Sequence, residues 1–183
     1  MTALWTVIAL LSVIVVVDSV AIIALTRQIG LLHLRGGPQH APQGRRGPQA
    51  GRRLQLDVPP AISGNGSGPE LVLYGFVRPE CGSCAAALPA FTSVASALRA
   101  SERAVLVSDA DEARTRDYLT RHGVTLPLVT GPQALQANDI PGTPYAVVAD
   151  RAGHVIAASA AFSAEQLEAM LGQARRASQV AAA

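Results

Sequence analysis

Apolar residues gather in two ways along the chain: one long run near the N-terminus and several short runs after residue 70. The long run, from Ala3 to Leu25, contains fourteen Leu, Ile and Val residues and a single charged residue, Asp18. The short runs have the length of strands and alternate with longer stretches that predict helices. The pattern therefore predicts an apolar N-terminal segment followed by a domain of alternating strands and helices.

The N-terminal run is long enough to cross a membrane. At about 1.5 Å per residue it would reach roughly 34 Å, which exceeds a hydrocarbon core of about 30 Å. A cleaved signal peptide would show a basic start, a shorter apolar core and a small-residue cleavage site, and none of these is clear here. We expect an uncleaved anchor over residues 1–26. Asp18 is then either a contact for a partner helix or a hydrated carboxylate.

Residues 27–56 have a different composition, dominated by Gly, Pro, Gln and Arg, and include the run GGPQHAPQGRRGPQAGRR. Such a segment predicts a flexible basic linker. Beside a bilayer its arginines would bind anionic lipid or serve as a solvated spacer. The positive-inside rule would place this flank, and the domain after it, in the cytoplasm.

The elements of the domain, expected over residues 57–177, follow from local signals. The apolar run from Leu71 to Val77 predicts a buried strand, and Pro127 predicts an edge or irregular position for a later strand. Ser163 followed by Gln166 predicts a helix start with a capping box. The expected strands are 71–77, 104–108, 126–130, 145–149 and 154–159, the expected helices are 84–100, 111–122, a short one near 132–138 and 163–176, and residues 178–183 form a disordered tail.

The two cysteines of the chain, Cys81 and Cys84, lie between a predicted strand and a predicted helix. The first sulfur is therefore expected at a helix N-terminus, where unpaired N–H groups and the helix dipole stabilise a thiolate. An ordinary thiol, with a pKa of about 8.5, is only a few per cent ionised at neutral pH. The spacing favours dithiol/disulfide exchange.

Other chemistries fit the cysteine pair less well. A structural disulfide would close so short a loop that it removes little entropy from the unfolded chain. Copper delivery would need a suitably placed Met or His ligand. Zinc would need further ligands at the spacing of a second half-site. The only other candidates for zinc are His33, His40, His122 and His154. We therefore expect neither a metal nor a cofactor.

Charge gives no case for nucleic-acid binding. The formal net charge is +2, and all fifteen basic residues are arginines. A preference for Arg over Lys is as easily a coding bias as a function.

The predicted order of elements, β-α-β-α-β followed by a hairpin and a last helix, resembles the thioredoxin fold. Cys81-x-x-Cys84 with Pro89 after it, then Gly142-Thr143-Pro144 before a strand and an Asp-x-x-Gly hairpin, resembles the membrane-tethered thioredoxin-like proteins of bacteria. The resemblance covers roughly residues 70–173. It implies an α/β fold with a central mixed sheet flanked by helices, preceded here by a single N-terminal transmembrane helix.

A narrower resemblance points to one family. The segment LTRQIGLLH, residues 25–33, and the CxxCxxxLP pattern from Cys81 to Pro89 are similar to the MauD family of methylamine utilisation proteins. This kinship implies a membrane-tethered thiol-disulfide oxidoreductase that acts on cysteines of exported proteins. Its client would be the disulfide-rich small subunit of methylamine dehydrogenase.

The resemblance also implies roles for individual residues. Cys81 would be the exposed nucleophile and Cys84 the resolving thiol that attacks the mixed disulfide. Pro144 would be a cis-proline facing the disulfide, and the Thr143 backbone would pair with an extended substrate segment. An ordinary trans turn is the other reading of Pro144.

Two positions depart from thioredoxin. Glu80 stands where thioredoxin has Trp, and Gly75 stands where it has a buried Asp, so Cys84 lacks the usual proton acceptor. Glu80 is either a substitute for that acceptor or an exposed, solvated carboxylate, and a carboxylate beside a thiolate would raise the thiol pKa. Gly82 and Ser83, between the cysteines, are the other candidates for tuning them.

A second function class stays open: a non-catalytic thioredoxin-fold binding or assembly module with a structural disulfide. Under the redox reading the partners would be protein thiols and disulfides, a membrane redox partner and the lipid bilayer. Kinship and disulfide chemistry favour an extracytoplasmic domain, against the orientation that the basic flank indicates. The direction of electron flow is not encoded in any motif.

Overall fold

A five-stranded mixed sheet forms the centre of the domain. The computed structural model describes residues 47–57, 70–160 and 163–181 of the chain. Across the sheet the strands follow the order β3-β2-β1-β4-β5. β1 pairs in parallel with β2, and β2 with β3, whereas β4 runs antiparallel to β1 and β5 antiparallel to β4. The strands are β1 (Leu71–Phe76), β2 (Glu102–Ser108), β3 (Leu128–Thr130), β4 (Tyr145–Asp150) and β5 (Val155–Ser159).

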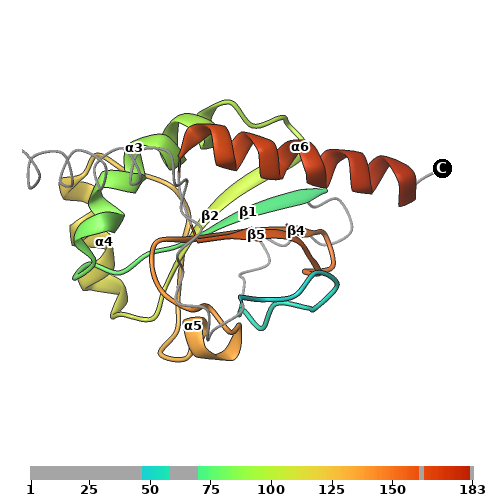
Figure 1. Cartoon of the computed structure of the whole chain (residues 1–183). Helices are drawn as coiled ribbons and strands as arrows, with labels where there is room; N and C mark the ends of the chain where they lie inside the picture. Colours follow the sequence, from blue (N-terminus) through green and yellow to red (C-terminus); the bar gives the residue numbers. More distant parts are fainter. Residues whose placement is uncertain (1–46, 58–69, 161–162, 182–183) are drawn as a thin grey trace, which may run out of the picture. The chain divides into compact units, whose positions relative to one another are not determined.

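Helices cover both faces of the sheet. Figure 1 shows α3 and α6 on one face and the short α5 on the other. Alternate residues of β1 face two separate cores, because successive side chains of a strand point to opposite faces. Leu71 and Leu73 pack with α3, α4 and α6, whereas Val72 and Tyr74 pack on the face of α5. The helices are α3 (Gly82–Ser96), α4 (Glu112–Arg121), α5 (Ala134–Ala137) and α6 (Ala164–Ala181).

The central strand positions the cysteines. All six residues of β1 are buried, as expected for an apolar run between two neighbouring strands. The ladder continues past its end, since the Val77 N–H donates to the Val107 carbonyl at 2.9 Å. The chain therefore leaves the sheet at the carboxyl edge of β1, and α3 begins there. This order and pairing confirm the thioredoxin-like α/β fold with a mixed sheet.

Two helix ends differ from the expected positions. α3 continues through Pro89 but ends at Ser96 rather than near residue 100. The Glu102 side chain accepts the Arg99 N–H at 3.0 Å, and the Glu102 N–H donates to the Arg99 carbonyl at 2.9 Å, so a closed turn replaces the last helical turn. α6 continues to Ala181, five residues beyond the expected end.

The end of the expected linker contacts the domain. The Gly51 N–H donates to the Val155 carbonyl at 2.7 Å, and the Val155 N–H donates to the Arg52 carbonyl at 2.8 Å. These bonds lay the segment along the outer edge of β5. Further along the same segment, the Gln55 N–H donates to the side-chain oxygen of the buried Asn138 at 2.7 Å. Residues 47–57 therefore pack on the domain.

The expected membrane anchor, residues 1–26, and the first part of the linker lie outside the described residues. Within the ranges that are described, no helix is both long and apolar enough to cross a bilayer. The anchor stays a prediction.

Candidate active site

The cysteine motif begins helix α3. Cys81 is the N-cap residue of the helix, with an extended backbone at φ −87° and ψ 102°. A backbone turn precedes it, since the Cys81 N–H donates to the Arg78 carbonyl at 3.1 Å, and the Cys84 N–H donates to the Cys81 carbonyl at 3.0 Å. The first N–H groups of a helix have no partner within it, and they carry the positive end of the dipole. Cys81 thus has the backbone environment that the sequence predicts for a stabilised thiolate.

The sulfur of Cys81 is partly exposed and lies among polar atoms. It is 3.2 Å from the Ser83 hydroxyl and 3.3 Å from the carbonyl oxygen of Thr143. Burial raises the pKa of this thiol, but its hydrogen bonds, of which those with Cys84 and Ser83 have the largest effect, together lower it by more, so its pKa lies below the ordinary value. Cys81 is therefore the more readily ionised of the two thiols.

Cys84 has the opposite environment. Its side chain is fully buried in the core between the sheet, α3 and α6. Burial, and then a hydrogen bond with Cys81, raise the pKa of Cys84 to about 12. Both residues are free thiols in this structure. The pair therefore combines one accessible sulfur with a lowered pKa and one inaccessible sulfur that holds its proton.

Thr143 and Pro144 are distant from the cysteines in the sequence, but the fold brings Thr143 into contact with Cys81. The Thr143–Pro144 peptide bond is cis, in agreement with the expected geometry. It precedes β4, the antiparallel neighbour of β1, so it lies at the same edge of the sheet as the start of α3. The structure thus brings Cys81 and Thr143 together, while their roles toward a substrate stay predictions.

The three candidates for tuning differ in their surroundings. Ser83 contacts the Cys81 sulfur directly. Gly82 is exposed, and a Cβ atom at this position would have no neighbour within 4 Å, so no close packing requires glycine there. Glu80 is half-exposed and pairs with Arg114 at 2.6 Å. This ion pair partly neutralises the carboxylate beside Cys81. Glu80 is exposed, as one of its two expected roles requires, and the role itself stays a prediction.

A second ion pair lies at the same edge. Arg78 Nε donates to Asp109 at 2.7 Å, and its terminal nitrogen also binds that carboxylate. Sequence reasoning did not select Arg78, Asp109 or Arg114. Arg78 and Asp109 each follow a buried strand, and the carboxyl ends of adjacent parallel strands meet at one edge, so this pair had a signal in the sequence. Arg114 had none.

Gly75, which stands where thioredoxin has a buried Asp, leaves no room for a side chain. A Cβ atom on Gly75 would lie 2.8 Å from two ring atoms of Phe91 and 3.0 Å from Leu106. Phe91 is fully buried, so its ring cannot move aside easily. The aromatic ring therefore fills the space that a side chain at residue 75 would need.

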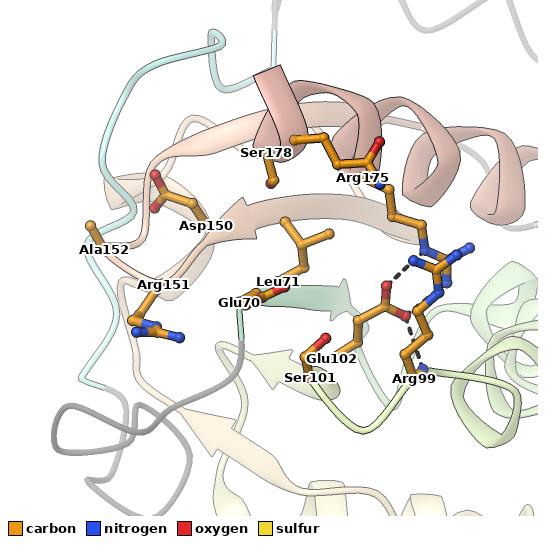
Figure 2. Close-up of a pocket in the computed structure, with 11 residues that line it drawn as sticks. Glu70, Leu71, Arg99, Ser101, Glu102, Asp150, Arg151, Ala152, Arg175 and Ser178 are labelled. Atoms are coloured by element: carbon orange, nitrogen blue, oxygen red, sulfur yellow. Dashed lines mark hydrogen bonds and ion pairs between the residues drawn. The ribbon is translucent and has the colours of Figure 1, made fainter. Parts of the chain in front are cut away.

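The part of the chain that the structure describes holds no group of three or more His, Cys, Asp or Glu side chains arranged to bind a metal. A hollow of about 550 Å³ lies at the opposite end of the strands, beside the starts of β1 and β2. Figure 2 shows Glu102 and Arg175 facing each other there. Glu102 and Arg175 pair with each other, and neither cysteine lines the hollow.

No protein-family model matches the chain. Curated MauD methylamine utilization proteins do: that of Methylophilus methylotrophus is 30% identical over 156 residues, which cover 81% of this chain and 73% of the relative. The MauD protein of Paracoccus versutus is 30% identical over 159 residues, covering 84% of this chain and 80% of the relative.

Solved structures share the fold at lower identity. A protein described as thiol:disulfide interchange protein DsbE from Chlorobium tepidum superimposes with a TM-score of 0.55 at 18% identity, covering 74% of this chain and 99% of that one. The thioredoxin domain of a thiol-disulfide oxidoreductase from Bacteroides vulgatus gives 0.53 at 16% identity, with 70% and 96% covered. These similarities support the thioredoxin-like fold.

Proposed function

Because the chain belongs to the MauD family of methylamine utilization proteins, and because its two thiols are so unequal, we propose that it is a thiol-disulfide oxidoreductase acting on protein cysteines. The observation that carries the proposal is the contrast between Cys81 and Cys84. The first is partly exposed with a lowered pKa, and the second is buried with a pKa of about 12. A structural disulfide would need no such contrast, whereas sequential attack does.

The reaction has two exchange steps. In the first, the Cys81 thiolate attacks one sulfur of a client disulfide, the client S–S bond breaks, and the second client sulfur leaves as a thiolate that takes up a proton. In the second, Cys84 attacks the Cys81 sulfur, a Cys81–Cys84 disulfide forms, and the first client sulfur is released. The protein is oxidised and the client reduced by two electrons. The same steps in reverse would oxidise a client.

The Thr143 carbonyl supplies a contact for the client during these steps. It lies 3.3 Å from the Cys81 sulfur, so a peptide N–H bound to it would be held next to the reacting atoms. Such a contact would favour clients whose cysteines lie in extended segments.

Family membership supports a place for this chemistry in methylamine utilization. We propose the disulfide-rich small subunit of methylamine dehydrogenase as the client, with the domain tethered by residues 1–26 on the extracytoplasmic side and a membrane redox partner restoring the thiols. Labelling Cys81 in intact cells with a membrane-impermeant maleimide tests the location. Labelling without cell lysis supports it, and labelling only after lysis places the domain in the cytoplasm.

The reduction potential of the Cys81–Cys84 pair tests the activity itself. The full-length protein would be equilibrated in defined thiol/disulfide buffers, and its oxidised fraction measured. A value near that of thioredoxin, about −270 mV, would indicate a reductant, and one between about −120 and −180 mV an oxidant or isomerase. A pair that does not exchange reversibly would contradict the proposal and favour a binding module with a fixed disulfide.

A further inference from the structure

Cys84 faces a difficulty in the second exchange step. It must lose its proton before it attacks, yet burial, and then a hydrogen bond with Cys81, raise its pKa to about 12 in the free dithiol. In the mixed disulfide the Cys81 sulfur is bonded to the client and carries no charge, so Cys81 no longer raises the pKa of Cys84, and burial is the obstacle that remains. Gly75 leaves no carboxylate to help, because Phe91 fills the space beside it.

The hydroxyl of Tyr118 is a polar group in the buried cluster that contains Cys84, and it has no role in the two exchange steps described above. The residue is only 5% exposed. Its hydroxyl is buried, and it has no hydrogen-bond partner among the residues that the structure describes. Buried polar groups in native proteins are nearly always paired, so an unpaired one calls for an explanation.

The position of Tyr118 relates it to the cysteines. Arg114, at the start of α4, pairs at 2.6 Å with Glu80, the residue directly before Cys81. Tyr118 lies four residues further along, and residues spaced by four share one face of a helix. It belongs to the same buried cluster as Cys84. Burial raises the pKa of Tyr118, and negative charge on Cys84 and then on Cys81 raises it further.

We propose that Tyr118 is a positioning residue for the second exchange step: its hydroxyl turns toward the Cys84 sulfur and stabilises the negative charge that forms there. This inference rests on the proposed oxidoreductase function. A hydroxyl can rotate to suit a new partner, and this one has no existing bond to break. The raised pKa keeps the phenol protonated at neutral pH, so that it donates a hydrogen bond and does not act as a base.

The step is balanced without a further reactant. The Cys84–Cys81 bond forms, the Cys81–client bond breaks, and its electron pair goes to the client sulfur. That sulfur takes up a proton equivalent to the one that Cys84 released. Tyr118 keeps its own proton throughout.

Few titratable groups face Cys84. Cys81 lies at the start of its own helix, and α4 contributes Tyr118, whose ring packs edge-to-face on His122 with centroids 4.7 Å apart. The residues of α6 in this core are apolar, and Tyr74 of β1 belongs to the opposite core. At the rim, the charges pair as Glu80 with Arg114 and Arg78 with Asp109. Thr143 and the Arg78 backbone already form hydrogen bonds that lower the pKa of Cys84, and the Tyr118 phenol is a further donor in the same cluster that has no partner among the described residues.

Glutathione release from the mixed disulfide isolates this step. The full-length reduced protein would be mixed with oxidised glutathione, and the release of the Cys81-bound glutathione followed across a range of pH in wild type and Tyr118→Phe. We expect release at neutral pH to slow about tenfold in the variant, with its inflection at higher pH, because a hydrogen bond to a charged group is lost. Formation of the mixed disulfide should keep its wild-type rate.

Tyr74→Phe is the matched control, because Tyr74 is also 5% exposed but packs on the opposite face of the sheet. It should leave glutathione release unchanged. A second test incorporates 3-fluorotyrosine at position 118, whose more acidic phenol is a stronger donor, and release should become faster.

The outcomes separate the two proposals. If wild type releases glutathione and Tyr118→Phe matches it in rate and pH profile, the role of Tyr118 is wrong and the oxidoreductase function stands. If fluorination leaves the rate unchanged or lowers it, the role of Tyr118 is also contradicted. If wild type forms no mixed disulfide, both proposals fall.

Discussion

The carbonyl oxygen of Thr143 lies 3.3 Å from the Cys81 sulfur, although 62 residues separate the two in the chain. A carbonyl oxygen only accepts hydrogen bonds, so it can bind the protonated thiol but not the thiolate. Ionisation of Cys81 therefore frees this oxygen at the moment when the sulfur becomes nucleophilic. The freed oxygen is then available to a backbone N–H of a client.

The order of attack predicts which cysteine traps clients. Cys84→Ser should accumulate mixed disulfides through Cys81, because the partly exposed thiol still attacks and nothing resolves the product. Cys81→Ser should accumulate few, since the remaining thiol is fully buried and has a pKa of about 12. Non-reducing gels of both variants, purified from cells, would show the difference. Equal trapping by the two variants would contradict the assigned order.

The lowered pKa of Cys81 predicts its alkylation behaviour. Burial opposes ionisation, and the hydrogen bonds of Cys81, chiefly those with Cys84 and Ser83, together outweigh it. Alkylation of the native protein should therefore reach half its maximal rate at a lower pH than in the unfolded protein. Ser83→Ala removes one of these bonds and should slow alkylation at pH 7 by about twofold to tenfold. Stopped-flow alkylation with iodoacetamide measures both effects.

Ser93→Ala is the control for that change, since Ser93 is an exposed serine on the same helix. It should leave the alkylation rate unaltered. If Ser93→Ala and Ser83→Ala behave alike, the 3.2 Å contact between Ser83 and Cys81 does not set the thiol pKa.

The close packing at Gly75 predicts a loss of stability on adding a side chain. Gly75→Ala would place a Cβ atom 2.8 Å from the buried ring of Phe91, and overpacking of this kind destabilises by about 1–3 kcal/mol. Gly82→Ala should be neutral or stabilising by up to about 1 kcal/mol, because its Cβ has open space and alanine favours a helix. Urea unfolding measures both. Equal effects of the two substitutions would show that the core adapts around residue 75.

The ion pair between Glu102 and Arg175 predicts a pH-dependent contribution to stability. Arg175 donates two hydrogen bonds of 2.7 Å to the buried Glu102 carboxylate. These bonds lower the pKa of Glu102, against the opposing effect of burial. Arg175→Met would leave the buried carboxylate without its ion-pair partner, with only the Arg99 N–H still bound, and we expect the free energy of unfolding at pH 7 to fall by about 3 kcal/mol.

The sign of the pH effect follows from the lowered pKa. The contribution of Glu102 is fully present above its ordinary pKa of 4.5 and is lost as pH falls through its folded value, so wild type and Arg175→Met should converge in acid. Arg121→Met is the control, because Arg121 and Asp117 pair at the surface with both side chains 68% exposed, and such pairs contribute about 0–1 kcal/mol. A constant difference between wild type and Arg175→Met from pH 7 to pH 3 would exclude Glu102 as its source.

Local signals in the sequence determined most of the elements. The Ser163 hydroxyl accepts the Gln166 N–H at 3.3 Å, and the Gln166 side chain accepts the Ser163 N–H at 3.4 Å, so the predicted capping box is confirmed. β3 lies at a sheet edge, one of the two positions expected from Pro127. A cap or a strand pattern depends on residues within about four positions, which the sequence displays directly.

The positions of Cys81 and Cys84 were also predictable from the sequence, because a turn between a strand and a helix depends on neighbouring residues. The sequence by itself placed the first sulfur at the start of α3 and the second within it, and the resemblance to the thioredoxin fold supplied Thr143 and Pro144. The sequence did not determine that α3 ends at Ser96, ahead of the turn that the side chain of Glu102 closes with Arg99.

Only the tertiary structure decided which distant groups meet. The pairing of Glu102 with Arg175 spans 73 residues, and the position of Tyr118 beside the cysteine core depends on how α4 packs. Phe91 fills the space next to Gly75 because α3 crosses β1 at that point. Such contacts depend on strand order and helix packing, which are properties of the whole chain, and no short segment of sequence encodes them.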